Sequence, residues 1–233
     1  MKKIRTLQDL TDRLDDDLVW RKREISTLKF LHDRARGHEK TALRRAGIAL
    51  LYAHFEGYFK AAGTSYAEYV SRQNLRYRDL VPGFLALSVR AKLSQVADSA
   101  RGQLLSQIAA FFVESMDEPV RLSWENAVKT KSNLGSERLK DIFAFLALDY
   151  QYFEIREKTV IEHLLVHRNS IAHGKPLLVE DDDFERLTKE VTGMLDKFRD
   201  ILEDSAQAQS FLRAGVGDVE PNSSGAFRDE SEL

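Results

Sequence analysis

The sequence contains no cysteine, only four prolines and only twelve glycines in 233 residues. The lack of cysteine excludes disulfides, thiolate metal sites and cysteine nucleophiles, and it fits a reducing compartment. No stretch approaches the roughly 18 apolar residues that a membrane-spanning helix needs. The charged N-terminal segment also lacks the apolar core of a secretory signal. These absences predict a cytoplasmic protein without a membrane partner.

The residues that are present favour a helical, globular protein. Hydrophobic residues make up 43% of the chain and charged residues 31%, which is enough apolar material for one sizeable core. Scarce glycine and proline, with abundant leucine, alanine, glutamate and lysine, indicate helices. The net charge of −2 gives no basic signature for the whole chain. A role with nucleic acid therefore has to come from a local site.

Apolar spacing divides the N-terminal third into two long helices. Residues 4–34 carry one stripe at spacings of three, four or seven, which is typical of a coiled-coil arm or the outer helix of a bundle. His32 continues this stripe, so a structural role is expected for it. Residues 40–62 carry both a small-residue and a bulky stripe, which predicts a central helix.

Further helices are expected along the rest of the chain. Pro82 and Gly83 mark a break, and Ser136 is a suitable N-cap for a helix over 137–147. Asp182 and Glu185 form a capping-box-like pair before a strongly periodic last helix. The remaining expected helices cover 65–73, 85–98, 101–115 and 152–172, the last one stopping at Gly174 and Pro176.

This pattern predicts an all-α, antiparallel helical bundle with three parts. Residues 1–36 form the long N-terminal helix, and residues 37–213 form the main helical domain. Residues 214–233 hold five acids, one base and several glycines and serines, which predicts a flexible acidic tail.

Arg168 is an anomaly in the expected helix 152–172. It shares a stripe with Ile161, Leu164, Leu165 and Ala172, where a buried cation costs several kcal/mol unless it is paired. We therefore expect Arg168 to have a partner or to line a cleft or an interface.

His173 lies five residues after Arg168, at the C-terminus of the same helix. On a helix this spacing separates the two side chains by about 140° around the axis. They can converge on one ligand only at a helix end or across a two-fold interface. Histidine exchanges protons near neutral pH, and an arginine fork suits a phosphate.

The string Arg168-Asn169-Ser170-Ile171-Ala172-His173 resembles the R-x4-6-H motif of the HEPN superfamily, including the polar residue directly after the arginine. The strings ALLYAHFEGYFK and KTKSNLGSERL resemble the bacterial MAE-type HEPN proteins, close to the RiboL-PSP-HEPN group. The resemblance covers roughly residues 40 to 204.

The resemblance implies a helical homodimer in which two such motifs face one composite cleft. Many members are metal-independent endoribonucleases that act as toxins or defence effectors. By this resemblance, His173 transfers the proton when the ribose 2′-OH attacks the adjacent phosphate, and Arg168 stabilises the developing charge. Asn169 positions the histidine or the phosphate. The implied products are a 2′,3′-cyclic phosphate and a 5′-hydroxyl.

Four further residues are candidates for supporting roles. His54 and Glu56 on the central helix could orient the motif, or Glu56 could pair with Lys60 and His54 could be structural. Ser170 could contact substrate or only pack. Lys175 could meet the RNA backbone or remain solvated.

For the remaining charged groups, an ordinary structural role is the first expectation. His163 and His167 have the spacing of a metal-binding pair, but no third ligand is evident, so polar or interface roles and no metal are expected. The acidic run from Glu180 to Asp183 is expected to cap a helix, with repulsion of RNA or attraction of a basic antitoxin as alternatives.

A basic stretch could follow RNA phosphates, with Tyr69 and Tyr77 stacking bases, although a solvated face is the commoner explanation. The members of this stretch are Arg72, Arg76, Arg78, Arg90, Lys92 and Arg101.

The sequence is compatible with three functions. The first is an endoribonuclease in a toxin–antitoxin or antiphage setting, with RNA as substrate, a second copy of the chain in the site, and an antitoxin or defence partner. The second is a non-catalytic module that binds RNA, a nucleotide or a protein. The third is a helical scaffold whose N-terminal helix pairs with another protein. No phosphate-binding loop or paired catalytic carboxylates stand out, so no cofactor is expected.

Overall fold

The computed structural model describes residues 2–93, 101–128, 133–176 and 179–214. These residues form helices joined by turns, with two isolated β-bridges and no strand among them, which confirms the all-α prediction. The expected acidic tail lies almost wholly outside the described residues. Within the described residues, no helix is both long enough and apolar enough to span a membrane.

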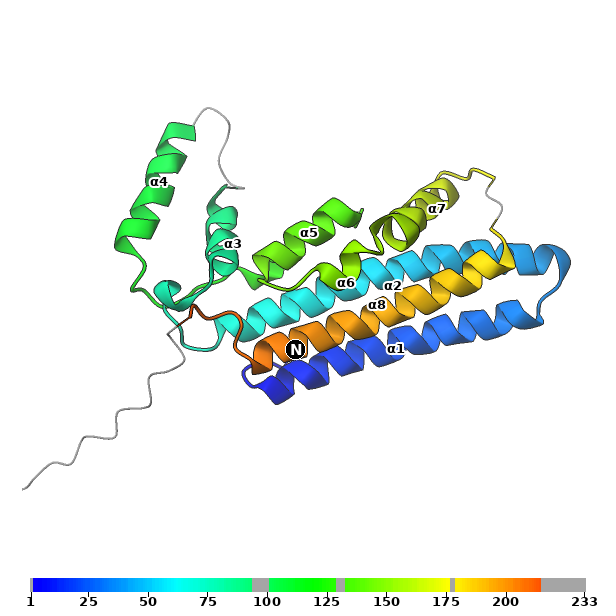
Figure 1. The fold of residues 1–233 in the computed structure, drawn as a ribbon, viewed down its shortest axis with the longest axis horizontal. Helices are drawn as coiled ribbons and strands as arrows, with labels where there is room; N and C mark the ends of the chain where they lie inside the picture. The colour runs from blue at the N-terminus through cyan, green and yellow to red at the C-terminus, as the bar shows by residue number, and fades with distance from the viewer. Residues whose placement is uncertain (1, 94–100, 129–132, 177–178, 215–233) are drawn as a thin grey trace, which may run out of the picture.

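Three long helices lie side by side and form the body of the molecule (Figure 1). They are α1 (Leu7–Arg34), α2 (Gly37–Ser71) and α8 (Asp181–Gln207). α1 begins with a capping box in which Thr6 and Asp9 satisfy each other's backbone N–H groups. α1 packs against both α2 and α8, so it is an outer helix of the bundle, one of the two predicted alternatives. The structural role predicted for His32 is confirmed, since it is buried against Phe184 and Asp181.

α2 is one continuous helix, although the sequence predicted two helices over 40–62 and 65–73. Gly63 lies at the predicted break, but it remains helical and is packed against side chains from distant segments of the chain. A Cβ on Gly63 would lie 2.8 Å from Val128 Cγ2 and 3.2 Å from Leu146 Cδ1. The glycine therefore permits close packing instead of ending the helix.

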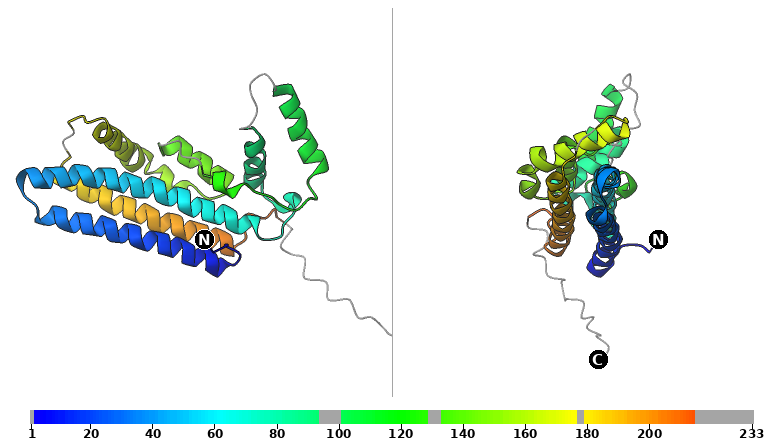
Figure 2. Two further views of the ribbon diagram at one scale, coloured as in Figure 1. Left: turned by 180° about the vertical axis from the view of Figure 1, so that it is seen from behind. Right: turned by 90° about the vertical axis from the view of Figure 1, so that its right-hand side faces the viewer.

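The remaining helices cover one side and one end of this body. α3 (Pro82–Leu93) and α4 (Arg101–Glu114) project from one end, as Figure 2 shows from behind. α5 (Ser136–Phe145), α6 (Gln151–Glu154) and α7 (Glu162–Ala172) lie along α2. Short helical turns complete the set: η1 (Tyr77–Asp79), η3 (Trp124–Asn126) and the π-helical η4 (Glu157–Ile161).

Several predicted helix ends differ from the structure. Pro82 is the first residue of α3 and not a break, because proline fits the first helical turn, where no N–H partner is needed. The expected single helix over 152–172 is divided into α6, η4 and α7. Gly135, not Ser136, is the N-cap of α5, and Ser136 is instead buried against Glu162.

α8 supplies the most regular apolar face of the core, as its periodicity predicted. Phe198 stacks on Phe59 of α2 with ring centroids 4.2 Å apart. The capping box predicted for Asp182 and Glu185 is wrong, because the N-cap is Glu180 and makes no side-chain cap. Asp181, in the first turn, instead forms ion pairs with Lys40 at 2.6 Å and with Arg44 at 3.1 Å.

Candidate active site

The segment that carries the R-x4-H motif ends in a tightly closed helix terminus. His173 is the C-cap of α7, and Gly174 follows with a φ of +66°, a left-handed conformation that glycine adopts without strain. Its N–H donates to Ile171 O at 3.0 Å, and the Lys175 N–H donates to Ser170 O at 2.9 Å. This pair of bonds is a Schellman motif. The predicted stop at Gly174 is therefore correct, and the motif residues lie on the last two turns of α7 and at its C-cap.

Arg168 is held in place by neutral groups. Its Nη1 donates to Asn169 Oδ1 at 2.9 Å and to Asn133 Oδ1 at 3.2 Å. Its guanidinium also lies over the ring of Tyr52, 4.9 Å from the centroid, in a cation–π contact. Among the described residues, no carboxylate forms an ion pair with it. The positive charge is thus oriented without being neutralised, which suits an anion.

The loop that supplies Asn133 is fixed to two helices on either side. The Leu134 N–H donates to the Tyr52 hydroxyl at 2.6 Å. Glu162 at the start of α7 accepts from the Ser136 N–H at 2.8 Å and also from the Ser136 hydroxyl. Gly135 leaves room for this contact, since a Cβ there would lie 3.2 Å from Glu162 Oε1. Asn133 therefore reaches Arg168 from a fixed position.

Tyr52 lies beneath the guanidinium of Arg168. Its side chain is only 2% exposed, and burial, with a further contribution from Glu56, raises its pKa to about 12. The Leu134 N–H and the charge of Arg168 act in the opposite direction. The hydroxyl therefore stays protonated at neutral pH, and Glu56 lies on the same side of α2 as the arginine.

The other motif residues lie toward the surface of α7. His173 is exposed, and among the described residues its side chain has no hydrogen-bond partner. Ser170 is half-buried and contributes its carbonyl to the helix end. Lys175 is exposed, and its carbonyl accepts a bond from Arg45 at 3.1 Å. Val166 lies two turns before His173, and 59% of it is exposed.

His54 does not join this group. It is 3% exposed and faces α1, where Nε2 lies 2.9 Å from Glu24 Oε2 and the ring packs edge-on against Trp20 at 5.3 Å. Burial lowers its pKa. His54 lies on the opposite side of α2 from Tyr52, so within one copy of the chain it packs toward α1 and does not contact Arg168.

The structure buries the two tyrosines of the basic stretch and places protein groups beside its described arginines. Tyr77 and Tyr69 are buried, packed against Phe111 and Phe211, so the prediction that they stack bases is wrong. The described arginines of this stretch have protein partners: Arg72 pairs with Glu68, Arg76 and Arg78 pair with Asp117, and Arg90 lies over Phe145. Lys92 and Arg101 have side chains outside the described part.

Sequence reasoning missed Tyr52 and Asn133. Both lie in the strings that carry the family resemblance, ALLYAHFEGYFK and KTKSNLGSERL, which was the available signal. By its spacing alone, Tyr52 is one of several bulky residues on the helix predicted over 40–62. Neither residue could be assigned to Arg168 without knowing which segments meet.

Of the comparisons with known proteins, the one with family models gives a match. Neither the curated proteins nor the solved structures give a match. The model of the MAE_28990-like HEPN family matches residues 10–211, from the first turn of α1 to the residues after α8. Membership of this superfamily indicates a nuclease or an RNA-binding module. The chain belongs to the MAE_28990-like HEPN family.

Proposed function

We propose that the protein is a homodimeric endoribonuclease that uses Arg168 and His173 and needs no metal ion for the chemistry. The observation that carries this proposal is the state of Arg168. It is oriented by Asn133, Asn169 and Tyr52, yet no described carboxylate neutralises it. A cation held in this way is preorganised for a phosphate and does not have to reorganise as charge develops.

The proposed reaction is an internal transfer within RNA. His173 accepts the proton of a ribose 2′-OH, whose oxygen attacks the adjacent phosphorus. The bond from phosphorus to the 5′ oxygen breaks, and that oxygen takes a proton from a second acid. Arg168 stabilises the additional negative charge on the phosphoryl oxygens. The products are a 2′,3′-cyclic phosphate and a 5′-hydroxyl, and DNA, which lacks the nucleophile, is not a substrate.

A second copy of the chain completes the site in this proposal. Arg168 and His173 are separated by about 140° and about 7.5 Å along one helix, so one copy aims them in different directions. Two copies of α7 that meet across a two-fold axis bring an arginine of one near the histidine of the other. The exposed Val166 on the same helix supplies apolar surface for that contact. His173 of the second copy can then act as the acid.

The test is cleavage of an RNA pool in the presence of EDTA. Wild type should cut RNA and leave 2′,3′-cyclic phosphate ends, detected by mass spectrometry. His173→Ala and Arg168→Ala should each lower the rate about 100-fold or more. His38→Ala, at an exposed histidine of α2, is the matched control and should leave the rate unchanged. Equal rates in wild type and both motif variants would refute the assignment.

A toxin or defence role is the biological setting that we propose for this activity. Expression of wild type in a bacterial host should arrest growth, and expression of His173→Ala should not. Growth arrest by both proteins would contradict a role that depends on cleavage. An antitoxin or another defence protein would be the partner that restrains the enzyme.

One observation favours a second candidate, a module that binds RNA, a nucleotide or a protein without turnover. Among the described residues, no side chain orients His173, whereas a general base is normally held by a partner. Binding of RNA without any products, unaffected by His173→Ala and lost in Arg168→Ala, would select this candidate over the enzyme.

A further inference from the structure

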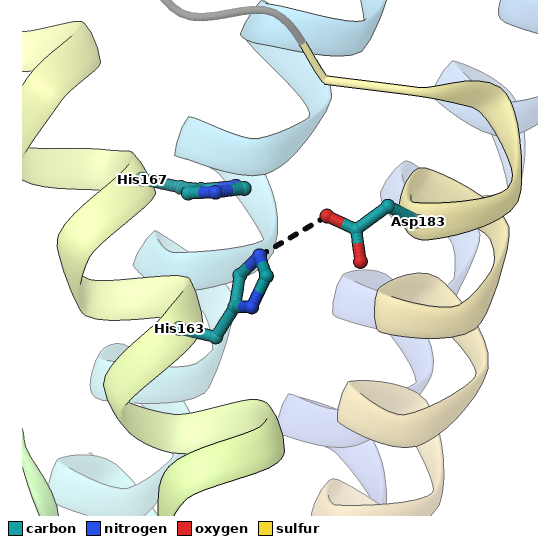
Figure 3. A group of neighbouring side chains, drawn as sticks. All are labelled: His163, His167 and Asp183. Atoms are coloured by element: carbon teal, nitrogen blue, oxygen red, sulfur yellow. Dashed lines mark hydrogen bonds and ion pairs between the residues drawn. The ribbon is translucent and has the colours of Figure 1, made fainter.

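Two histidines of α7 and one aspartate of α8 form a compact group (Figure 3). His163 and His167 lie one helical turn apart, with ring centroids separated by 4.1 Å. Asp183 belongs to the first turn of α8, and its Oδ2 lies 3.1 Å from His163 Nε2. One donor atom from each of the three residues lies within 4.8 Å of the other two.

The group is only partly satisfied by protein contacts. His167 Nδ1 is buried and, within the described part of the chain, has no hydrogen-bond partner. A buried polar atom without a partner is destabilising unless something else binds it or its ring. His163 and Asp183, by contrast, are already directed toward one another, as the dashed contact in Figure 3 shows.

We propose that His163, His167 and Asp183 bind a zinc ion that ties α7 to α8. Two imidazoles and a carboxylate are a usual zinc ligand set, with water in the fourth position. Tetrahedral ligands about 2.0–2.1 Å from zinc lie roughly 3.3 Å from each other. The contact between His163 and Asp183, at 3.1 Å, is already close to this length. The remaining separations between donor atoms are within 4.8 Å, so binding has to shorten them by at most about 1.5 Å. The sequence offered the two histidines alone, and the third ligand comes from the following helix.

The surroundings of Asp183 support this geometry. Its second oxygen, Oδ1, accepts from Arg186 Nη2 at 2.6 Å, and Arg186 Nη1 donates to the Thr159 carbonyl at 3.0 Å. Arg186 therefore fixes the carboxylate with Oδ2 turned toward the histidines. Hydrogen bonds of this kind orient ligating carboxylates in metal sites. The positive charge of Arg186 reduces the affinity for a cation, so we expect binding weaker than that of an all-cysteine site.

The zinc ion in this proposal links α7 to α8 and keeps a water molecule in its fourth position. His167 directly precedes Arg168, but its ring faces α8, whereas the guanidinium of Arg168 lies over Tyr52 of α2. A bound ion would thus hold the helix that carries the motif without contacting the phosphate. The proposal does not depend on ribonuclease activity, and the RNA chemistry proposed above does not use the ion.

Zinc binding by the isolated protein tests the proposal. Protein freed of metal by dialysis against a chelator, and then returned to chelator-free buffer, is titrated with zinc chloride in competition with a chromophoric zinc indicator. Wild type should bind one equivalent. His167→Gln should bind at least about tenfold more weakly, and it removes no protein hydrogen bond of the described residues. His38→Gln, which replaces an exposed histidine, should bind as wild type does.

Thermal unfolding gives a second readout. Zinc at about 100-fold excess over its Kd should raise the Tm of wild type by about 5–10 °C, and it should leave His167→Gln unchanged. Circular dichroism confirms that the variant is folded. Asp183→Asn should lose zinc as well, and if it does not fold, because the Arg186 contact is weakened, His167→Gln alone decides.

Two outcomes would overturn the zinc site. One is a wild type that takes up no zinc, and the other is equal uptake by wild type and His167→Gln. Arg168→Ala and His173→Ala should bind zinc normally. A protein that binds zinc but does not cleave RNA would refute the proposed activity and leave the metal site intact.

Discussion

Asn133 Oδ1 lies 3.2 Å from Nη1 of Arg168, which joins the loop before α5 to the last turns of α7. This contact and the Asn169 contact at 2.9 Å are made by amide oxygens, so the arginine is aimed without losing its charge. The distinction between a neutral and an acidic partner at Asn133 therefore gives a sharp test of the site.

Replacing Asn133 by aspartate should abolish RNA cleavage while the protein stays folded. The new carboxylate would pair with Arg168 and compete with the substrate phosphate. Asn133→Ala should be milder and lower kcat about tenfold, because Arg168 keeps Asn169 and Tyr52 as partners. Steady-state cleavage rates of the two variants, with circular dichroism as a check of folding, compare them. A more severe defect in the alanine variant would contradict this view of Arg168.

Removing the Tyr52 hydroxyl should destabilise the protein. Tyr52→Phe keeps the ring beneath Arg168 but leaves the buried Leu134 N–H without its 2.6 Å acceptor. The loss should be about 1–3 kcal/mol in the free energy of unfolding, measured with urea. Tyr66→Phe is the matched control. The Tyr66 hydroxyl is buried and, among the described residues, has no partner, so its removal should cost little or be stabilising.

Gly63→Ala should lower stability even though alanine is the better helix former. Its Cβ would lie 2.8 Å from Val128 Cγ2 in a packed interface, and such overpacking costs about 1–3 kcal/mol. Gly102→Ala in α4 meets nothing within 4 Å and should be stabilising by up to about 1 kcal/mol. Urea unfolding of both variants would show the opposite signs. Equal changes in the free energy of unfolding for the two variants would mean that packing around Gly63 does not determine the effect of the substitution there.

The buried His54 should make stability depend on pH. Burial lowers its pKa from the ordinary value of 6.5, so below that value the unfolded chain binds a proton that the folded chain resists. Stability attributable to His54 is therefore present at neutral pH and is lost as the pH falls below about 6.5, by at most about 1.4 kcal/mol per pH unit.

Urea unfolding between pH 7.5 and pH 5 measures this dependence. His54→Gln should flatten the profile, whereas His38→Gln, at an exposed position, should leave it as in wild type. A profile that keeps its slope in His54→Gln would assign the dependence to other groups.

Placing a charge on the exposed face of α7 should separate the proposed dimer. Val166→Glu puts a carboxylate where 59% of an apolar side chain is exposed, and it should give a monomer that no longer cleaves RNA. Val113→Glu on α4, where 82% of the side chain is exposed, is the control and should not change the mass measured by light scattering. A Val166→Glu dimer with normal activity would place the interface elsewhere.

The helices whose apolar residues recur with the helical period could be predicted from the sequence. The apolar face of α8 and the stop at Gly174 follow from local rules, since both depend on residues within a few positions. Local rules failed at Gly63, because this glycine allows close packing against Val128 and does not end the helix. They also failed at Ser136, because its hydroxyl donates to Glu162 and does not cap the helix. In both cases the deciding contact comes from a distant segment.

The candidate site divides in the same way. The sequence alone determined that Arg168, Asn169 and His173 share one helix end, because their spacing and the terminating glycine lie in one short string. It also determined that thiol chemistry is absent. Only the tertiary structure decided that Asn133 and Tyr52 hold Arg168, that His54 faces α1, and that Asp183 joins His163 and His167. Each of these facts depends on which helices pack together, and the free energy of that packing comes from the buried core as a whole and not from the site residues.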